Sequence, residues 1–371
     1  MGMRFLTFIL LLFLNGCTLT VPKEIEVKYD EIPEKVDFNY HVKPILSDRC
    51  YSCHGPDEKS RRAGLRLDQE NTAFMKLSSG KTPIDPGSIS GSEMAHRILS
   101  NDPDEVMPTP ESNLSLTNTE KAILLRWIEQ GAEWKEHWSF LPVQEVPSLS
   151  SDQYKNPIDY FVSKKLQTQG LDFSAISSKE KLIRRLYFDL TGLPPSIDEV
   201  ESFVESNDKN AYLNIVNTLL DSDEHAERLT MDWLDVSRYA DSHGLHADGI
   251  RTMWPWRDWV IKAFKKNTPY DEFVSVQLSG DMRENPTKGE ILATAFNRNN
   301  PMTAEGGVID EEWRLNYVFD RTETFGTAVM GLTLMCAKCH DHKFDPISQK
   351  DYYQLSAFFN QTREIGMTGD D

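Results

Sequence analysis

The sequence "RCYSCHGPD", Arg49–Asp57, contains two cysteines separated by two residues and followed at once by a histidine. A second copy of this pattern, "MCAKCHDH", lies near the other end of the chain at Met335–His342. The pattern is compatible with half of a zinc site, with a redox disulfide or with a covalent haem anchor. The choice among these three chemistries decides how both halves of the chain are interpreted.

The two histidines favour haem attachment. A four-cysteine zinc site, or two disulfides, would leave both histidines without a role. In a haem c anchor, both thiols add to the vinyl groups of the porphyrin and the histidine binds the iron. The chain has five cysteines, and only Cys17 lies outside the two motifs. We therefore assign two covalent haems, one to Cys50, Cys53 and His54 and the other to Cys336, Cys339 and His340.

Residues around the first motif predict the plan of a class I cytochrome c. Val42, Ile45 and Leu46 form one apolar face of a short helix that leads into the cysteines. Downstream, Thr117 and Glu120 form a capping box that begins a second helix, which carries an apolar stripe. In this plan the haem lies between the two helices.

The loop before the second helix supplies a candidate for the sixth iron ligand. Met107 is followed by a proline in this loop, and its position between the haem motif and the last helix favours it. A methionine is otherwise most often a core residue. The rival ligands are Met94 and His96 in "SEMAHRIL", where core or surface roles would suffice.

The N-terminus predicts export and a membrane anchor. "FLTFILLLFL" (Phe5–Leu14) is too short to span a bilayer and fits the apolar region of a secretory signal. Leu14–Cys17 resembles the bacterial lipoprotein processing site, which implies cleavage before Cys17 and lipidation of its sulfur. The alternative is a chance cysteine behind a simple signal peptide. Several acyl chains on one residue give stable anchoring. We expect a signal peptide over residues 1–16 and a tether over 17–36.

Charge narrows the range of partners. The net charge of −18 argues against nucleic acid as a partner, because nothing here would neutralise phosphates. An acidic surface either attracts basic partners or only keeps the protein soluble. The length of 371 residues and the hydrophobic content of 39% are those of a globular protein with two or three domains.

After a connector over residues 142–156, the pattern is helical to the end of the chain, so we predict a mainly α fold with a larger helical domain over 157–371. Ser177 with Glu180, and Ser196 with Glu199, are expected to cap two of its helices. "MWPWRDWV" is interpreted as core packing, with a functional aromatic cluster as the alternative. "NRNNPMTAEGGVIDEE" is either a functional loop or a surface turn.

The second haem motif is expected to lie between two helices. The helix behind it should be capped by Ser348 and Asp351, with Leu355, Phe358 and Phe359 as an apolar face beside the porphyrin.

The sixth ligand of the second haem must come from a remote segment, or the iron is five-coordinate. His342 is too close to His340 to reach the opposite side of the iron. Glycine-containing loops can bring a side chain over the iron. His243 is the first choice, Met302 the second, and His246 a further candidate.

Several long stretches resemble the planctomycete-type cytochrome c multidomain family. "VKPILSDRCYSCHGPD", "DEVMPTP" and "WIEQGAEWKEHWSF" are similar to its cytochrome c domain, over about 37–141. "LIRRLYFDLTGLPPS", "MDWLDVSRYADSHG" and "CAKCHDHKFDPISQKDYYQLSAFFN" are similar to the helical domain of unknown function that follows it. The resemblance implies a further C-terminal domain, so a truncated member or a fragment is expected.

Together these observations predict a lipid-anchored dihaem c-type cytochrome that transfers electrons at the bacterial cell envelope, on the periplasmic side or the cell surface. Its expected partners are a redox protein and, through Cys17, the membrane. An open second haem would instead indicate a haem-dependent oxidoreductase or peroxidase-like enzyme, with His243 and Glu305 as acid–base groups. A surface binding or scaffold protein is the third interpretation. Fold analogy does not decide among the three.

Overall fold

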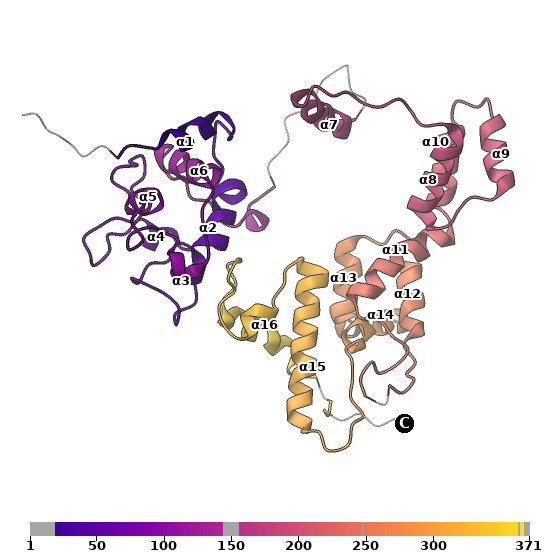
Figure 1. Ribbon diagram of the computed structural model, residues 1–371. Helices are drawn as coiled ribbons and strands as arrows, with labels where there is room; N and C mark the ends of the chain where they lie inside the picture. Colours follow the sequence, from indigo (N-terminus) through magenta and orange to yellow (C-terminus); the bar gives the residue numbers. More distant parts are fainter. Residues whose placement is uncertain (1–18, 144–155, 247, 363, 367–371) are drawn as a thin grey trace, which may run out of the picture. The chain divides into compact units, whose positions relative to one another are not determined.

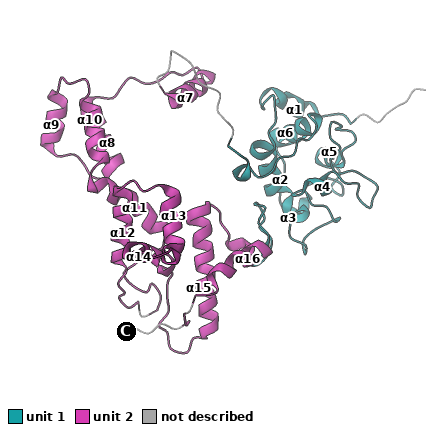
Figure 2. Cartoon of the chain, turned by 180° about the vertical axis from the view of Figure 1, so that it is seen from behind, with its two compact units in different colours: residues 1–143, 339–349 teal, residues 144–338, 350–371 magenta. Residues whose placement is uncertain are grey.

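The computed structural model describes residues 19–143, 156–246, 248–362 and 364–366 (Figure 1). This part of the chain is mainly helical, as predicted, and its only extended pairing is two isolated bridges, Ser242–Ile250 and Gly244–Met302. The chain divides into two compact units: unit 1 is 1–143 with 339–349, and unit 2 is 144–338 with 350–371 (Figure 2). Cys17 and the predicted signal peptide lie outside the described residues.

Unit 1 is built from short helices joined by long loops. Its α-helices are α1 (Lys23–Glu26), α2 (Lys43–Arg49), α3 (Tyr51–His54), α4 (Glu70–Ala73), α5 (Glu93–Leu99) and α6 (Asn118–Glu129). A π-helical turn over Phe38–Val42 leads directly into α2, and 3₁₀ turns span Val27–Asp30, Pro110–Ser112 and Trp138–Phe140.

Helix α6 supplies much of the core of unit 1. Thr117 and Glu120 form the predicted capping box at its start, with each side chain bonded to the other residue's backbone N–H. Leu124, Trp127 and Ile128 are fully buried, which confirms most of the predicted stripe. Helix α6 therefore presents a continuous apolar face to the rest of the unit.

The segment before the cytochrome-like helices differs from the tether expected over 17–36. Ile25, Ile32 and Val36 are all buried in the core of unit 1, and α1 packs against α6. Arg126 of α6 also donates hydrogen bonds to the carbonyls of Ile32 and Pro33. Regularly spaced apolar residues within an otherwise charged stretch explain why this segment folds onto the unit.

Unit 2 contains the longer helices. They are α7 (Pro157–Thr168), α8 (Lys179–Thr191), α9 (Ile197–Glu205), α10 (Ala211–Leu220), α11 (Asp223–Val236), α12 (Trp254–Lys265), α13 (Tyr270–Ser279), α14 (Lys288–Ala293), α15 (Asp310–Phe325) and α16 (Gln349–Phe359). Shorter 3₁₀ or π turns span Gly280–Met282, Thr294–Arg298, Gly326–Met330 and Met335–Lys338. Helix α11 packs against α8, α10 and α12, and thereby joins the first helices of the unit to its centre.

One of the helix caps predicted in unit 2 is confirmed and another is wrong, while the Ser348–Asp351 cap of α16 stays a prediction. The Ser196–Glu199 capping box at α9 is confirmed. The predicted Ser177–Glu180 cap is wrong, because α8 begins after Ser178, whose side chain makes no capping bond to the backbone. The helix starts one residue later than predicted, and the residue three positions after Ser178 is Lys181, so a capping box cannot form there.

Tryptophan and phenylalanine side chains form the core of unit 2. Trp256 is fully buried beside Phe296, and Trp259 stacks on Phe273 with ring centroids 5.7 Å apart. Trp254, in contrast, is half-exposed. The "MWPWRDWV" stretch is therefore core packing, as interpreted from the sequence.

The predicted apolar face of α16 is wrong in part. Phe358 is 81% exposed, and the buried side chains of this helix are Tyr352 and Ser356. The Tyr352 hydroxyl donates to Glu323 of α15 at 2.9 Å, so a polar contact selects the inward face. Apolar periodicity alone therefore pointed to the wrong side of the helix.

Candidate functional site

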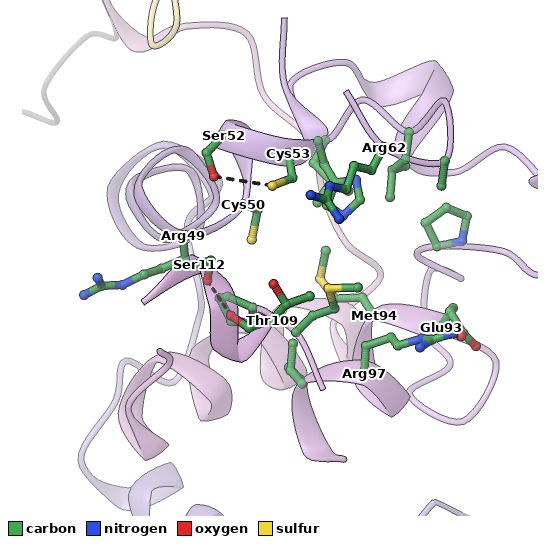
Figure 3. A pocket seen from close by; sticks show the side chains of 18 of the residues that line it. Arg49, Cys50, Ser52, Cys53, Arg62, Glu93, Met94, Arg97, Thr109 and Ser112 are labelled. Atoms are coloured by element: carbon green, nitrogen blue, oxygen red, sulfur yellow. Dashed lines mark hydrogen bonds and ion pairs between the residues drawn. The ribbon is translucent and has the colours of Figure 1, made fainter. Parts of the chain in front are cut away.

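The first Cys-x-x-Cys-His motif lies in the wall of a cavity of about 380 Å³ in unit 1 (Figure 3). Cys50, Cys53 and His54 all contribute to this wall. Most of the remaining wall is apolar, and includes Leu65, Leu67, Leu77, Pro83, Ile98, Pro108, Leu114 and Leu116. The three residues that haem c attachment requires are thus gathered in one mainly apolar cavity.

Helix α3 places the motif by ending abruptly. His54 N–H donates to Cys50 O at 2.9 Å, which closes a single helical turn around the two cysteines. The chain then folds back, and the backbone N–H groups of Arg62 and Leu67 donate to the carbonyls of Cys53 and His54, each at 2.8 Å. These bonds satisfy carbonyls that a helix end would otherwise leave unpaired. The motif is therefore fixed by main-chain contacts on both sides.

Gly55 allows this reversal of the chain. A Cβ atom at this position would lie 2.4 Å from the carbonyl oxygen of Tyr51 and 2.8 Å from its Cβ. Real Cβ atoms do not approach so closely, so any side chain here would displace the turn. The glycine directly after the histidine is thus a steric requirement of the site.

Burial keeps the side chains of Cys50 and His54 neutral. Burial raises the pKa of the Cys50 thiol to about 12, with a further contribution from Cys53. Burial also lowers the pKa of His54, so its imidazole is neutral at pH 7 and a nitrogen lone pair is available to a metal. The buried Nδ1 atom of His54 has no hydrogen-bond partner among the described residues. These are the properties expected of a ligand to a buried metal.

Two methionines line the same cavity. Met107, the predicted sixth ligand, is joined there by Met94 of α5. His96, the other rival, is exposed and donates from Nε2 to the carbonyl of Ser90 at 2.9 Å, outside the cavity. The choice of sixth ligand therefore narrows to two thioethers, and Met107 stays a prediction.

Charged side chains are also present in the cavity wall. Glu93 pairs with Lys81 and Arg97, each at 2.8 Å, and Arg49 pairs with Glu120 at 3.4 Å. Arg62 lines the cavity as well and makes no ion pair with any described residue. It is the cation best placed to receive an additional carboxylate.

The residues present fit a haem c. The cytochrome c family implies this cofactor, which carries two vinyl groups, an iron and two carboxylates. Two thiols, a neutral imidazole, a thioether and an arginine face one mainly apolar cavity. When bound, the haem would supply one-electron redox chemistry, and the chain would supply ligands, burial and charge.

The second motif is arranged differently. Cys336 and Cys339 are both exposed free thiols. The His340 Nδ1–H donates to the carbonyl of Asp341 at 2.8 Å, which leaves Nε2 as the unprotonated ring nitrogen of the neutral form. This tautomer is the one that histidine uses when Nε2 binds a metal.

His342 belongs to the turn that follows the motif. It is buried, and its Nδ1 accepts from the backbone N–H of Phe344 and of Asp345 at 3.3 and 3.0 Å. His342 is therefore a structural part of this turn.

The first two of the three candidate sixth ligands of the second haem, His243 and Met302, are neighbours in unit 2. Met302 N–H donates to His243 O at 2.9 Å, and His243 is buried. Glu305 lies 4.0 Å from His246, and both side chains of this pair are exposed. His243 as an iron ligand stays a prediction.

Two arginines hold the loop that contains Met302, and sequence reasoning missed them. Arg251 donates to the carbonyls of Arg298, Asn299 and Asn300. Arg321 donates to Asn297 O at 2.6 Å and to Asn300 Oδ1 at 2.9 Å. Asn299 and Asn300 are completely buried, so this part of the loop is not a surface turn. In the sequence, only the cluster of Asn and Arg residues in "NRNN" could have indicated that this part of the loop is buried.

Neither a membrane span nor a multi-residue metal cluster appears in the described parts of the chain. None of their helices is long and apolar enough to cross a bilayer. No group of three or more His, Cys, Asp or Glu side chains among them is arranged to hold a metal ion.

Two family models match the chain, in the predicted order. The model described as Planctomycete cytochrome C matches residues 50–111, which include the first haem motif and Met107. The model described as a protein of unknown function (DUF1549), PSCyt2, matches residues 157–364, which include the second motif. Searches of curated proteins and of solved structures found no match. The second match covers more than half of the 371 residues, and the chain therefore belongs to the PSCyt2 family of proteins of unknown function, with a planctomycete cytochrome c region before it.

Proposed function

We propose that this chain is an exported, lipid-anchored c-type cytochrome that binds two haems and transfers electrons at the bacterial cell envelope. The observation that carries the proposal is the cavity in unit 1, where Cys50, Cys53, His54 and Met107 converge. This set comprises two attachment points and one ligand for each face of an iron.

Each residue of the cavity has a distinct task in this proposal. His54 binds the iron in its neutral form, and burial maintains that form. Met107 would offer a thioether to the iron, a ligand that favours the reduced state and raises the reduction potential. Arg62 pairs with a carboxylate of the haem. The apolar wall excludes water and so limits the reorganisation that accompanies a change of iron charge.

The proposal of a second haem rests on the sequence of its motif and on the tautomer of His340. The motif's thiols are accessible for attachment, since Cys336 and Cys339 are both exposed. The membrane anchor rests on the apolar run and on Cys17. The acidic net charge favours a basic redox protein as the partner.

Mass spectrometry of denatured protein tests the proposal directly. The full chain would be matured with a cytochrome c assembly system and then unfolded, so that only covalently attached haem remains. We expect two haem masses on the wild type. The Cys50→Ser/Cys53→Ser and Cys336→Ser/Cys339→Ser variants should each retain one. Bound zinc in place of haem, or no covalent haem, would refute the proposal.

Fractionation of cells tests the anchor separately. The wild type should sediment with membranes, whereas Cys17→Ala should leave the membrane fraction while keeping its haems. Thr20→Ala is the matched control, because it changes the same segment without removing the thiol, and it should stay with the membranes. Membrane association of Cys17→Ala equal to that of the wild type would exclude lipidation at this position.

A further inference from the structure

The back of helix α3 lines a second cavity of unit 1, of about 340 Å³. Cys50, Cys53 and His54 line the first cavity, whereas Tyr51 of the same helix lines the second. Phe38 and Trp134 contribute to the second cavity as well. A single helical turn therefore separates the two cavities.

The other wall of this second cavity comes from the chain that follows the second haem motif. Residues 342–346 all line it, and they begin two positions after His340. They belong to unit 1 together with Cys339 and His340. The histidine of the second motif and the helix of the first motif are therefore parts of one compact unit.

A contact between a histidine and a carboxylate fastens this segment. His137 Nε2 lies 2.9 Å from Asp345 Oδ1, and the two side chains are only 9% and 20% exposed. On the other side of the ring, Nδ1 accepts from the backbone N–H of Ser139 at 3.3 Å. Nδ1 is thus an acceptor, so Nε2 carries the proton and donates it to the Asp345 carboxylate. The bond therefore forms with neutral histidine.

The segment is also fixed internally. His342 N–H donates to Ile347 O at 2.8 Å, and Gln349 N–H donates to Asp341 Oδ1 at 2.9 Å. Both bonds close the turn that starts at the motif.

We propose that residues 339–349, which include Cys339 and His340 of the second motif, dock on the back of α3, and that electrons pass between the two motifs within one chain. This inference rests on the proposed function. In each transfer one electron is lost at one motif and gained at the other, with no bond made or broken. The external donor and acceptor are the redox partners of the proposed function.

Hydrogen exchange of the full chain tests the docking without depending on haem. Amides in residues 342–347 should be protected in the wild type, and Asp345→Ala and His137→Ala should each raise their exchange rate roughly tenfold, as expected for loss of a charge-assisted hydrogen bond. In the double variant these amides should exchange no faster than in either single variant, because both substitutions remove the same hydrogen bond. His96→Ala is the matched control, since His96 is an exposed histidine of the same unit, and it should change nothing.

Electron paramagnetic resonance of the oxidised protein tests the proximity of the haems. We expect magnetic coupling between the two ferric irons, which the Cys336→Ser/Cys339→Ser variant abolishes and Asp345→Ala weakens. Two covalent haems with the spectra of isolated centres would overturn the inference and leave the proposed function intact. Unprotected amides over 342–347 would overturn the docking, even if the second motif carried no haem.

Discussion

Met94 of α5 and Met107 of the loop that follows it line the same cavity as the two cysteines of the first motif. Two thioethers thus compete for one coordination position. Met107 lies in the loop before the last helix of the cytochrome region, and its backbone N–H donates to Arg97 O at 3.1 Å, which ties this loop to α5. The placement of one methionine is therefore linked to that of the other.

Leucine substitution distinguishes the two methionines. Met107→Leu preserves side-chain volume but removes the sulfur, so the weak iron–sulfur charge-transfer band should disappear and the reduction potential should fall. Met94→Leu is the matched control and should keep both properties. Absorption spectra and a redox titration of the matured protein measure them. The opposite pattern would assign the ligand to Met94.

Replacement of Gly55 should damage the haem site through sterics alone. Gly55→Ala places a methyl group against the Tyr51 carbonyl, and overpacking of this kind costs about 1–3 kcal/mol. We expect a lower melting temperature and less attached haem. Gly306→Ala is the control, because nothing lies within 4 Å of its added Cβ and its φ is not positive. Equal behaviour of both variants in thermal unfolding would contradict the steric argument.

The arginines of α15 should differ sharply in their contribution to stability. Arg321 is 4% exposed and pairs with Glu364, whose side chain is 16% exposed. Arg321→Ala therefore leaves a largely buried carboxylate unpaired and should cost about 3–5 kcal/mol. Arg314 on the same helix pairs with the exposed Glu311, and Arg314→Ala should cost at most about 1 kcal/mol. Denaturant unfolding measures the difference. Similar losses for both would show that the buried pair does not stabilise the loop at 297–303.

The contact between His137 and Asp345 should weaken in acid. Burial lowers the pKa of His137 below its usual 6.5, the charge of Lys43 lowers it further, and Asp345 opposes both. The unfolded chain therefore takes up the proton more readily, so the stability from neutral His137 is fully present above pH 6.5 and is lost as the pH falls through the folded pKa.

His137→Phe tests this pH dependence. The wild type should melt at a higher temperature than the variant at pH about 8, and the difference should shrink at pH about 5. A difference that grows in acid would mean that the protonated histidine is the form that binds Asp345. His96→Ala, measured at the same two pH values, is the control for changes in melting temperature that do not depend on His137.

The helix content and the cytochrome c region could be predicted because they depend on local sequence. A Thr117–Glu120 capping box, for example, needs only four residues. Met107 could be proposed as a ligand because it lies in the loop between the haem motif and the last helix, where a class I cytochrome c has its methionine ligand. Its rival Met94 required the structure, since only the cavity brings the two sulfurs together.

Features that depend on distant partners could not be predicted. The inward face of α16 is set by a hydrogen bond from Tyr352 to Glu323, and no periodicity in the helix reveals it. Burial of Asn299 and Asn300 depends on arginines that come from two separate segments. The docking of Asp345 onto His137 joins residues that lie far apart in the sequence.

Unit 1 is built from two separate stretches of the chain, 1–143 and 339–349, and the second stretch is synthesised much later than the first. Cys50 and Cys53 leave the ribosome long before residues 339–349, which complete the same unit. Contacts between such distant positions form late, because a long loop must close first. The first haem site can therefore take shape early, while the wall behind Tyr51 arrives only after residue 339 has been made. A pause in synthesis or export before that point would leave the second cavity of unit 1 without the wall formed by residues 342–346, and such an intermediate would be a target for chaperones and proteases.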